Sequence, residues 1–167
     1  MKKIFFLVSL IFSLCVNCYG QDMAIYKSPY FNFTVEYPAD WETRELSGIV
    51  GFISPQENVN DDFSENVNIV VEGLSQNPMT LEQYMDASLV NAEKMIPNFK
   101  LLNKGNATID NNDARYIVYT GEGKFKIKAY TLIMNYKAYT LTYIAKESDF
   151  DTYLSKAEAI MKSFRCN

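Results

Sequence analysis

Alternating apolar and polar residues predict β-strands along most of the chain. The clearest example is segment 30–37, where Phe31, Phe33 and Val35 alternate with polar residues until Pro38 ends the pattern. A period of two places successive side chains on opposite faces of a sheet, so each such segment is expected to bury one face. By the same criterion, the predicted strands are 30–37, 49–54, 66–73, 101–109, 113–120, 124–134 and 137–145.

Two other segments repeat their apolar residues at spacings of three and four, which is typical of amphipathic helices. The first follows Thr80, which forms the sequence of a capping box with Gln83, and it ends before Pro97. The second starts with the comparable pair Ser148 and Asp151 and continues almost to the last residue. Each helix is expected to pack one apolar face on the sheet.

The order of these elements predicts an α+β fold. Links of two or three residues join the last four predicted strands, and such short links favour antiparallel neighbours. In strand 124–134, one face is mostly apolar, whereas the other carries Lys124, Lys126 and Lys128 before it becomes apolar. This uneven face predicts an α-β-α sandwich in which the second helical layer covers only part of an antiparallel sheet.

The first residues predict a secretory signal. Lys2 and Lys3 precede an apolar stretch that is too short to span a membrane, and small residues follow it up to Gly20. Cleavage after Gly20 would remove residues 1–20 and leave 21–167 as a single domain that works outside the cytoplasm, either periplasmic or secreted. That mature chain contains no predicted transmembrane span.

Charge, cysteine and histidine content narrow the possible functions. With a formal net charge of −4, the chain is not expected to bind nucleic acid. Of the three cysteines only Cys166 lies beyond the signal, so an intramolecular disulfide is excluded, and acylation of Cys15 or Cys18 is disfavoured by the residues before them. The absence of histidine removes most familiar nucleophile systems, so the chain is predicted not to be an enzyme.

Residues 55–65, here called the acidic loop, form the candidate metal site. Asp61, Asp62 and Glu65 supply the oxygen ligands that calcium prefers, although Phe63 stands where an EF-hand needs glycine. A solvated loop without metal is the alternative, and no other cofactor is predicted. The same carboxylates could act as general acid and base if one of them had a raised pKa inside a cleft.

Lys124, Lys126 and Lys128, here called the lysine stripe, share one face of the predicted strand 124–134. A basic stripe on an acidic protein can bind an acidic partner or an anionic membrane surface. An ordinary solvated face is the alternative, as is a row of lysines that protects an exposed strand from edge pairing.

Three segments, taken in order, resemble the PsbP superfamily, including its PsbP-like and DcrB-like secreted bacterial members. They are F-T-V-E-Y-P-A-D-W at 33–41, D-F-S-E-N-V-N-I at 62–69 and Y-T-L-T-Y at 139–143, within a resemblance that spans roughly residues 28–164. The resemblance implies an α-β-α sandwich around an antiparallel sheet, in agreement with the hydrophobic pattern. It also implies a secreted accessory or binding domain without catalytic activity.

The leading hypothesis is therefore a non-catalytic, extracytoplasmic domain that binds or supports an envelope or membrane-associated protein complex. The lysine stripe and the acidic loop are its two candidate contact surfaces. A small-molecule or calcium-binding protein, with its pocket between sheet and helix, is the alternative. A carboxylate-based enzyme is the third possibility.

Overall fold

The computed structural model describes residues 22–121 and 123–166, so the signal predicted at 1–20 lies outside the described part of the chain. The strands are β1 (Met23–Lys27), β2 (Phe33–Pro38), β3 (Glu42–Leu46), β4 (Ile49–Ile53), β5 (Asn66–Gly73), β6 (Lys100–Ile109), β7 (Asn112–Gly121), β8 (Phe125–Met134), β9 (Lys137–Lys146) and β10 (Arg165–Cys166). The helices are α1 (Leu81–Met95) and α2 (Phe150–Lys162).

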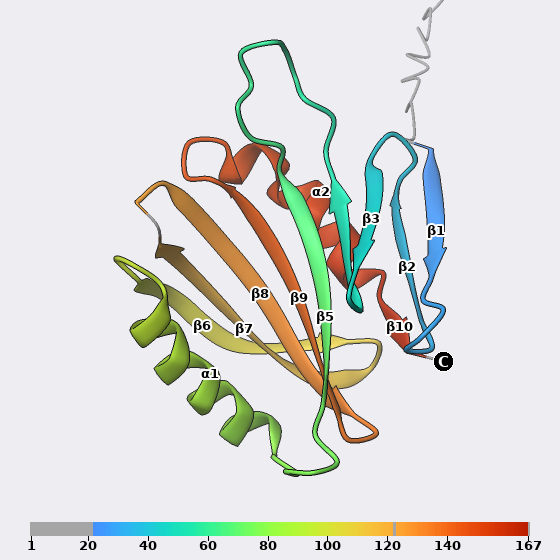
Figure 1. Cartoon of the computed structure of the whole chain (residues 1–167), viewed down its shortest axis with the longest axis vertical. Coiled ribbons are helices and arrows are strands. Elements are labelled where there is room, and N and C mark those ends of the chain that lie inside the picture. Colours follow the sequence, from blue (N-terminus) through green and yellow to red (C-terminus); the bar gives the residue numbers. More distant parts are fainter. Residues whose placement is uncertain (1–21, 122, 167) are drawn as a thin grey trace, which may run out of the picture.

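A seven-stranded antiparallel sheet, in the order β3-β4-β5-β9-β8-β7-β6, forms the middle layer. Helix α1 lies along one face beside β7 and β8, and α2 packs on the opposite face against β9, β5 and β8 (Figure 1). A three-stranded sheet, β1-β2-β10, joins the layer of α2, which β2 contacts directly. The predicted α+β class and α-β-α sandwich are confirmed, with this small sheet as an addition.

Tight turns connect the hairpins of the β6-β7-β8-β9 meander. Asp110 and Asn111 between β6 and β7, like Asn135 and Tyr136 between β8 and β9, all have positive φ angles. Two successive positive φ angles define the type I′ turn, whose twist matches that of the flanking strands. Asp and Asn tolerate this conformation better than most residues, so these short polar links specify the antiparallel neighbours predicted from the sequence.

The two helices start differently. Thr80 and Gln83 form the predicted capping box: the Thr80 hydroxyl accepts from the Gln83 backbone N–H at 3.2 Å, and the Gln83 side chain accepts from the Thr80 N–H at 2.9 Å. The capping box predicted for Ser148 and Asp151 is wrong, because Asp149 is the N-cap of α2 and its side chain makes no cap hydrogen bond. Asp149 has a helical backbone rather than the extended conformation typical of a capping residue.

Strands β1, β3 and β10 are absent from the sequence prediction. Strand β3 is almost entirely polar and lies at the edge of the large sheet, so it lacks the alternation of a half-buried strand. The first predicted strand also starts later than expected, at Phe33. The Ser28 side chain accepts hydrogen bonds from the backbone N–H groups of Tyr30 at 3.4 Å and Phe31 at 3.1 Å, which shapes a turn before β2.

The two faces of the large sheet carry unequal cores. The main core lies on the side of α2 and includes Phe52, Tyr143 and Phe164, which are fully buried. The core beneath α1 is much smaller. Its buried residues are Met85, Ile117 and Ala129, packed with half-buried Leu81, Leu89, Leu101 and Tyr119. Helix α1 therefore covers its face of the sheet more loosely than α2 covers the other.

Candidate functional site

The three lysines of the lysine stripe differ in exposure: Lys124 is exposed, whereas Lys126 and Lys128 are partly buried against α2. Strand β8 lies between β7 and β9, so its lysines do not protect a sheet edge, and that interpretation is wrong. Lys126 Nζ lies 3.4 Å from Asp151 Oδ1 of α2, and 4.2 Å from the centre of the Phe150 ring. Lys124 is exposed and precedes the strand. Helix α2 thus covers part of the strand face that the sequence predicts to be solvated.

Glu158 of α2 binds the third lysine of the stripe. Its carboxylate accepts hydrogen bonds from Lys128, from Lys162 at 2.6 Å and from the Tyr130 hydroxyl at 3.3 Å. The side chains of Lys128 and Glu158 are only 14% and 24% exposed. Burial alone would raise the pKa of Glu158, but the hydrogen bonds from both lysines lower it to about 2. The role of the lysine stripe in partner binding stays a prediction, although two of its ammonium groups already have partners within the chain.

The carboxylates of the acidic loop point to separate partners. Asp61 accepts from the backbone N–H groups of Glu57 at 3.1 Å and Phe63 at 3.2 Å, whereas Asp62 forms an ion pair with Lys146. Glu65 is almost fully buried. Among residues 22–121 and 123–166, no group of three or more His, Cys, Asp or Glu side chains is arranged to hold a metal ion. Calcium binding by Asp61, Asp62 and Glu65 therefore stays a prediction without support from this geometry.

Glu65 has the raised pKa that a carboxylate-based enzyme would need for its general acid. Burial raises its pKa, a backbone hydrogen bond opposes that rise, and the nearby charges of Asp61 and Asp149 add to it. However, only 3% of Glu65 is exposed, which leaves its side chain closed to a substrate. The Tyr153 hydroxyl of α2 donates a hydrogen bond to Glu57, so the loop is tied to the helix. This arrangement fits a structural loop better than an acid-base site.

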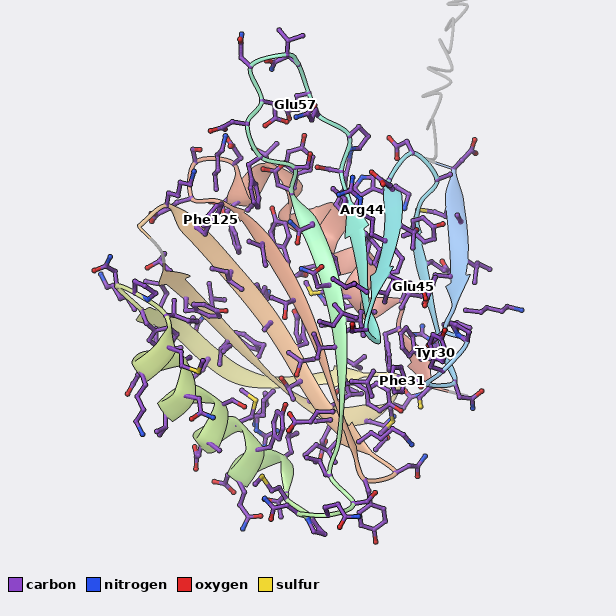
Figure 2. All side chains as sticks on the ribbon, in the orientation of Figure 1. Tyr30, Phe31, Arg44, Glu45, Glu57 and Phe125 are labelled. Carbon is purple, nitrogen blue, oxygen red and sulfur yellow. The ribbon has the colours of Figure 1, made fainter. Side chains whose placement is uncertain are left out.

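A different surface lies at the ends of two hairpins. We call it the hairpin-tip surface and define it by Tyr30, Phe31, Glu45 and Ile49, with the turn residues Ser47 and Gly48. In Figure 2, Tyr30 and Phe31 lie together at the end of the β1-β2 hairpin, with Glu45 of β3 close by.

Local turn chemistry builds this surface. Ser47 and Gly48 both have positive φ, as the type I′ turn between β3 and β4 requires. A Cβ atom on Gly48 would lie 3.3 Å from the Phe31 ring, so glycine lets the ring pack on the turn. Tyr30 and Ile49 are left 73% and 41% exposed, and the carboxylate of Glu45 accepts from the Tyr26 hydroxyl at 2.6 Å.

Sequence reasoning missed the hairpin-tip surface because the periodic pattern assigns 30–37 to a strand with Phe31 on its buried face. The available signals were Ser28 before the aromatic pair and Ser47-Gly48 between a polar segment and an apolar one, both of which favour turns. The hairpin-tip surface exposes aromatic and aliphatic side chains next to one carboxylate. They are suited to binding another molecule.

One comparison identifies the family. The sequence profile of the PsbP-like protein family matches residues 16–166, so the chain belongs to the PsbP-like family. Members of this family are generally non-catalytic accessory proteins. No protein of curated description matches the chain. Within the described part of the chain, no helix has the length and apolarity needed to cross a membrane.

Solved structures with the same fold come from several bacteria. CyanoP, the cyanobacterial PsbP of Synechocystis sp. PCC 6803, has a TM-score of 0.64 at 16% identity, covering 92% of this chain and 97% of its own. A Pseudomonas aeruginosa protein of unknown function, described as a candidate regulator, has a TM-score of 0.62 at 20% identity, covering 84% and 94%. LpqN of Mycobacterium tuberculosis, described as involved in cell envelope biogenesis, has a TM-score of 0.59 at 15% identity, covering 86% and 89%.

Proposed function

We propose that this PsbP-like protein is a non-catalytic accessory domain that works outside the cytoplasm and binds an envelope or membrane-associated protein. The observation that carries the binding function is the exposure of Tyr30 and Ile49 on the hairpin-tip surface. Support for the location comes from the signal predicted at 1–20 and from the envelope role stated for the structurally similar LpqN.

The hairpin-tip surface is better suited to a protein partner than the lysine stripe or the acidic loop. Lys126 and Lys128 bind carboxylates of α2, and Asp62 binds Lys146, so these groups would have to break existing pairs before they could bind a partner. Tyr30 and Ile49 can be covered by a partner without breaking an ion pair. Large exposed aromatic and aliphatic side chains supply much of the binding free energy of protein interfaces when a partner covers them.

The charge of this surface specifies the partner further. Glu45 is its carboxylate, and it holds the hydroxyl of Tyr26, whose pKa is raised to about 12 by burial and by that hydrogen bond. The whole chain is also acidic, with a formal net charge of −4. We therefore expect the partner to offer an apolar depression for Tyr30 and Ile49, with basic residues at its rim facing Glu45.

Site-specific photo-crosslinking in the native cell tests this proposal. A photoreactive amino acid at position 49 should give one discrete crosslinked protein, and the additional change Tyr30→Ser should remove it. The matched control places the same photoreactive group at Val59, which is 99% exposed but lies in the acidic loop. The mass of the recovered protein, expected to begin at Gln21, reports its export.

The same discrete product from positions 49 and 59, or a product at 49 that survives Tyr30→Ser, would contradict binding through the hairpin-tip surface. Recovery of the protein only from the cytoplasm, with residues 1–20 still attached, would contradict the proposed location.

A further inference from the structure

A groove with a volume of about 280 Å³ separates α1 from β6 and β7 on the face of the sheet opposite α2. It is independent of the hairpin-tip surface, which lies at the other edge of the sheet. Helix α1 supplies the acidic wall of the groove and the strands supply the basic wall. The side chains that matter are Glu82 and Asp86 on the helix, Lys104 and Arg115 on the strands, and Met85, Leu89 and Ile117 between them.

Helix and strand geometry place each pair of like charges together. Glu82 and Asp86 are four residues apart, so they lie one turn apart on the same face of α1. In the register of β6 and β7, Lys104 is opposite Ile117 and Asn106 is opposite Arg115. Lys104 and Arg115 are therefore diagonal neighbours on one face of the sheet. Two carboxylates on one wall thus face two cations on the other.

These charged groups do not form ion pairs with one another. Within the described residues, Glu82, Asp86 and Lys104 form no ion pair or side-chain hydrogen bond, and Arg115 donates only to the carbonyl of the adjacent Ala114, at 3.2 Å. Like charges that are adjacent on a helix or a sheet repel each other. A ligand that carries both signs of charge would relieve the repulsion on both walls at once.

We propose that this groove binds a small zwitterion, namely an amino acid or dipeptide with a free amine, a free carboxylate and an apolar side chain. Arg115 and Lys104 bind the carboxylate, for which the planar guanidinium of arginine offers two parallel donors. Glu82 and Asp86 bind the ammonium group. The apolar side chain of the ligand packs on Met85, Leu89 and Ile117, of which Met85 and Ile117 are buried.

The volume of the groove sets the size of the ligand. At about 280 Å³, the groove is just below the usual range of small-molecule pockets, about 300–1,000 Å³, so it suits a ligand of one or two residues rather than a long peptide. This proposal goes beyond the proposed accessory function and does not depend on it.

Isothermal titration calorimetry with the dipeptide alanyl-leucine tests the proposal on the purified mature chain. We expect measurable binding of alanyl-leucine, and at least about tenfold weaker binding of N-acetyl-alanyl-leucine, which has no ammonium group, because a lost charged contact of about 1.4 kcal/mol is a factor of ten. Alanyl-leucinamide, which has no carboxylate, should lose affinity by a similar factor.

Two variants assign the walls of the groove. Arg115→Gln should remove the preference for a free carboxylate and keep that for a free amine, whereas Asp86→Asn should do the reverse. The matched controls are Lys100→Gln on β6 and Glu93→Gln on α1, which change exposed charges of the same elements outside the groove and should leave affinity unchanged. Thermal unfolding confirms that each variant is folded.

The proposal is overturned if alanyl-leucine does not bind at millimolar concentration. It is also overturned if both capped analogues bind as well as the free dipeptide, or if the control variants weaken binding as much as Arg115→Gln and Asp86→Asn. Because no partner protein takes part, failure of this test leaves the crosslinking experiment at the hairpin-tip surface unaffected.

Discussion

The two helices present carboxylates to the same sheet with opposite results. On α2, Glu158 binds Lys128 of the sheet and Lys162 of its own helix. On α1, Glu82 and Asp86 face cations of the sheet without forming an ion pair among the described residues. Both helices are amphipathic and both lie on a sheet face that contains basic residues, so charge alone does not explain the difference.

Packing depth does explain it. Helix α2 buries four residues, Phe150, Ala157, Ile160 and Met161, whereas α1 buries only Met85. A helix that buries a wide apolar face approaches the sheet closely, and its flanking carboxylates then come within hydrogen-bond distance of lysines on the strands. A helix held by a narrow apolar contact stays farther away, and its charged residues line a groove instead. The charge pattern of each face is therefore a consequence of its core.

The most direct test of the difference in packing between the two helices is to remove one buried side chain from each. Ile160→Ala should lower the free energy of unfolding by about 3–4 kcal/mol, because it leaves a cavity in the fully buried core. Met85→Ala should cost about 2 kcal/mol or less, because α1 can shift into the space. Urea denaturation followed by the fluorescence of Trp41, the only tryptophan, measures both variants.

Equal losses for Ile160→Ala and Met85→Ala would contradict the loose packing of α1. Backbone amide exchange gives a second measurement that does not rely on mutation. Amides of α1 should exchange through local opening, at a lower free energy than those of α2, which should require global unfolding.

The same contrast explains how much of the fold was visible in the sequence. The strands of the meander and both helices can be predicted from the spacing of their apolar residues, because each element buries one face and that face must be apolar. Strand β3 cannot be predicted in this way, because an edge strand of polar residues has no buried face and therefore no periodicity. Strand β10 has only two residues, which are too few to show a period. The Ser148–Asp151 capping box was wrong because α2 is fixed by its apolar face, so its first turn does not need a side-chain cap.

The ion pairs of α2 provide the second test. Glu158→Gln should lower the free energy of unfolding at pH 7 by about 1–2 kcal/mol, because a partly buried Lys128 loses its charged partner. The folded pKa of Glu158, about 2, lies below its ordinary value of 4.5. Its contribution is therefore complete above about pH 4.5 and is lost as the pH falls towards 2. The difference between the wild-type chain and the variant should shrink accordingly.

Asp86→Asn on α1 is the matched control for this pH dependence. Since Asp86 has no cation partner among the described residues, the stability difference caused by this substitution should stay within about 0.5 kcal/mol at every pH. A pH-dependent loss as large as that of Glu158→Gln would show that α1 closes on its cations in solution.

The candidate sites were less predictable than the fold because sequence shows which residues share a face but not what lies opposite that face. The lysine stripe was correctly placed on one side of a strand, yet the carboxylates of α2 that cover Lys126 and Lys128 come from the far end of the chain. The groove beneath α1 is likewise a product of the distance between helix and sheet. Alternation and spacing carry no information about that distance.

The smallest expected effect concerns the end of α1. Ile96, the C-cap of α1, packs on Gly121 of β7, where an added Cβ atom would lie 2.4 Å from the Ile96 side chain. Gly121→Ala should therefore push this end of the helix away and cost about 1 kcal/mol, the low end for overpacking, because α1 can yield. Gly73→Ala on β5 is the control, since its Cβ atom would meet nothing within 4 Å, and it should leave stability unchanged or slightly raised. Equal stability of the two variants in urea denaturation would show that the contact between Ile96 and Gly121 does not hold α1 against the sheet.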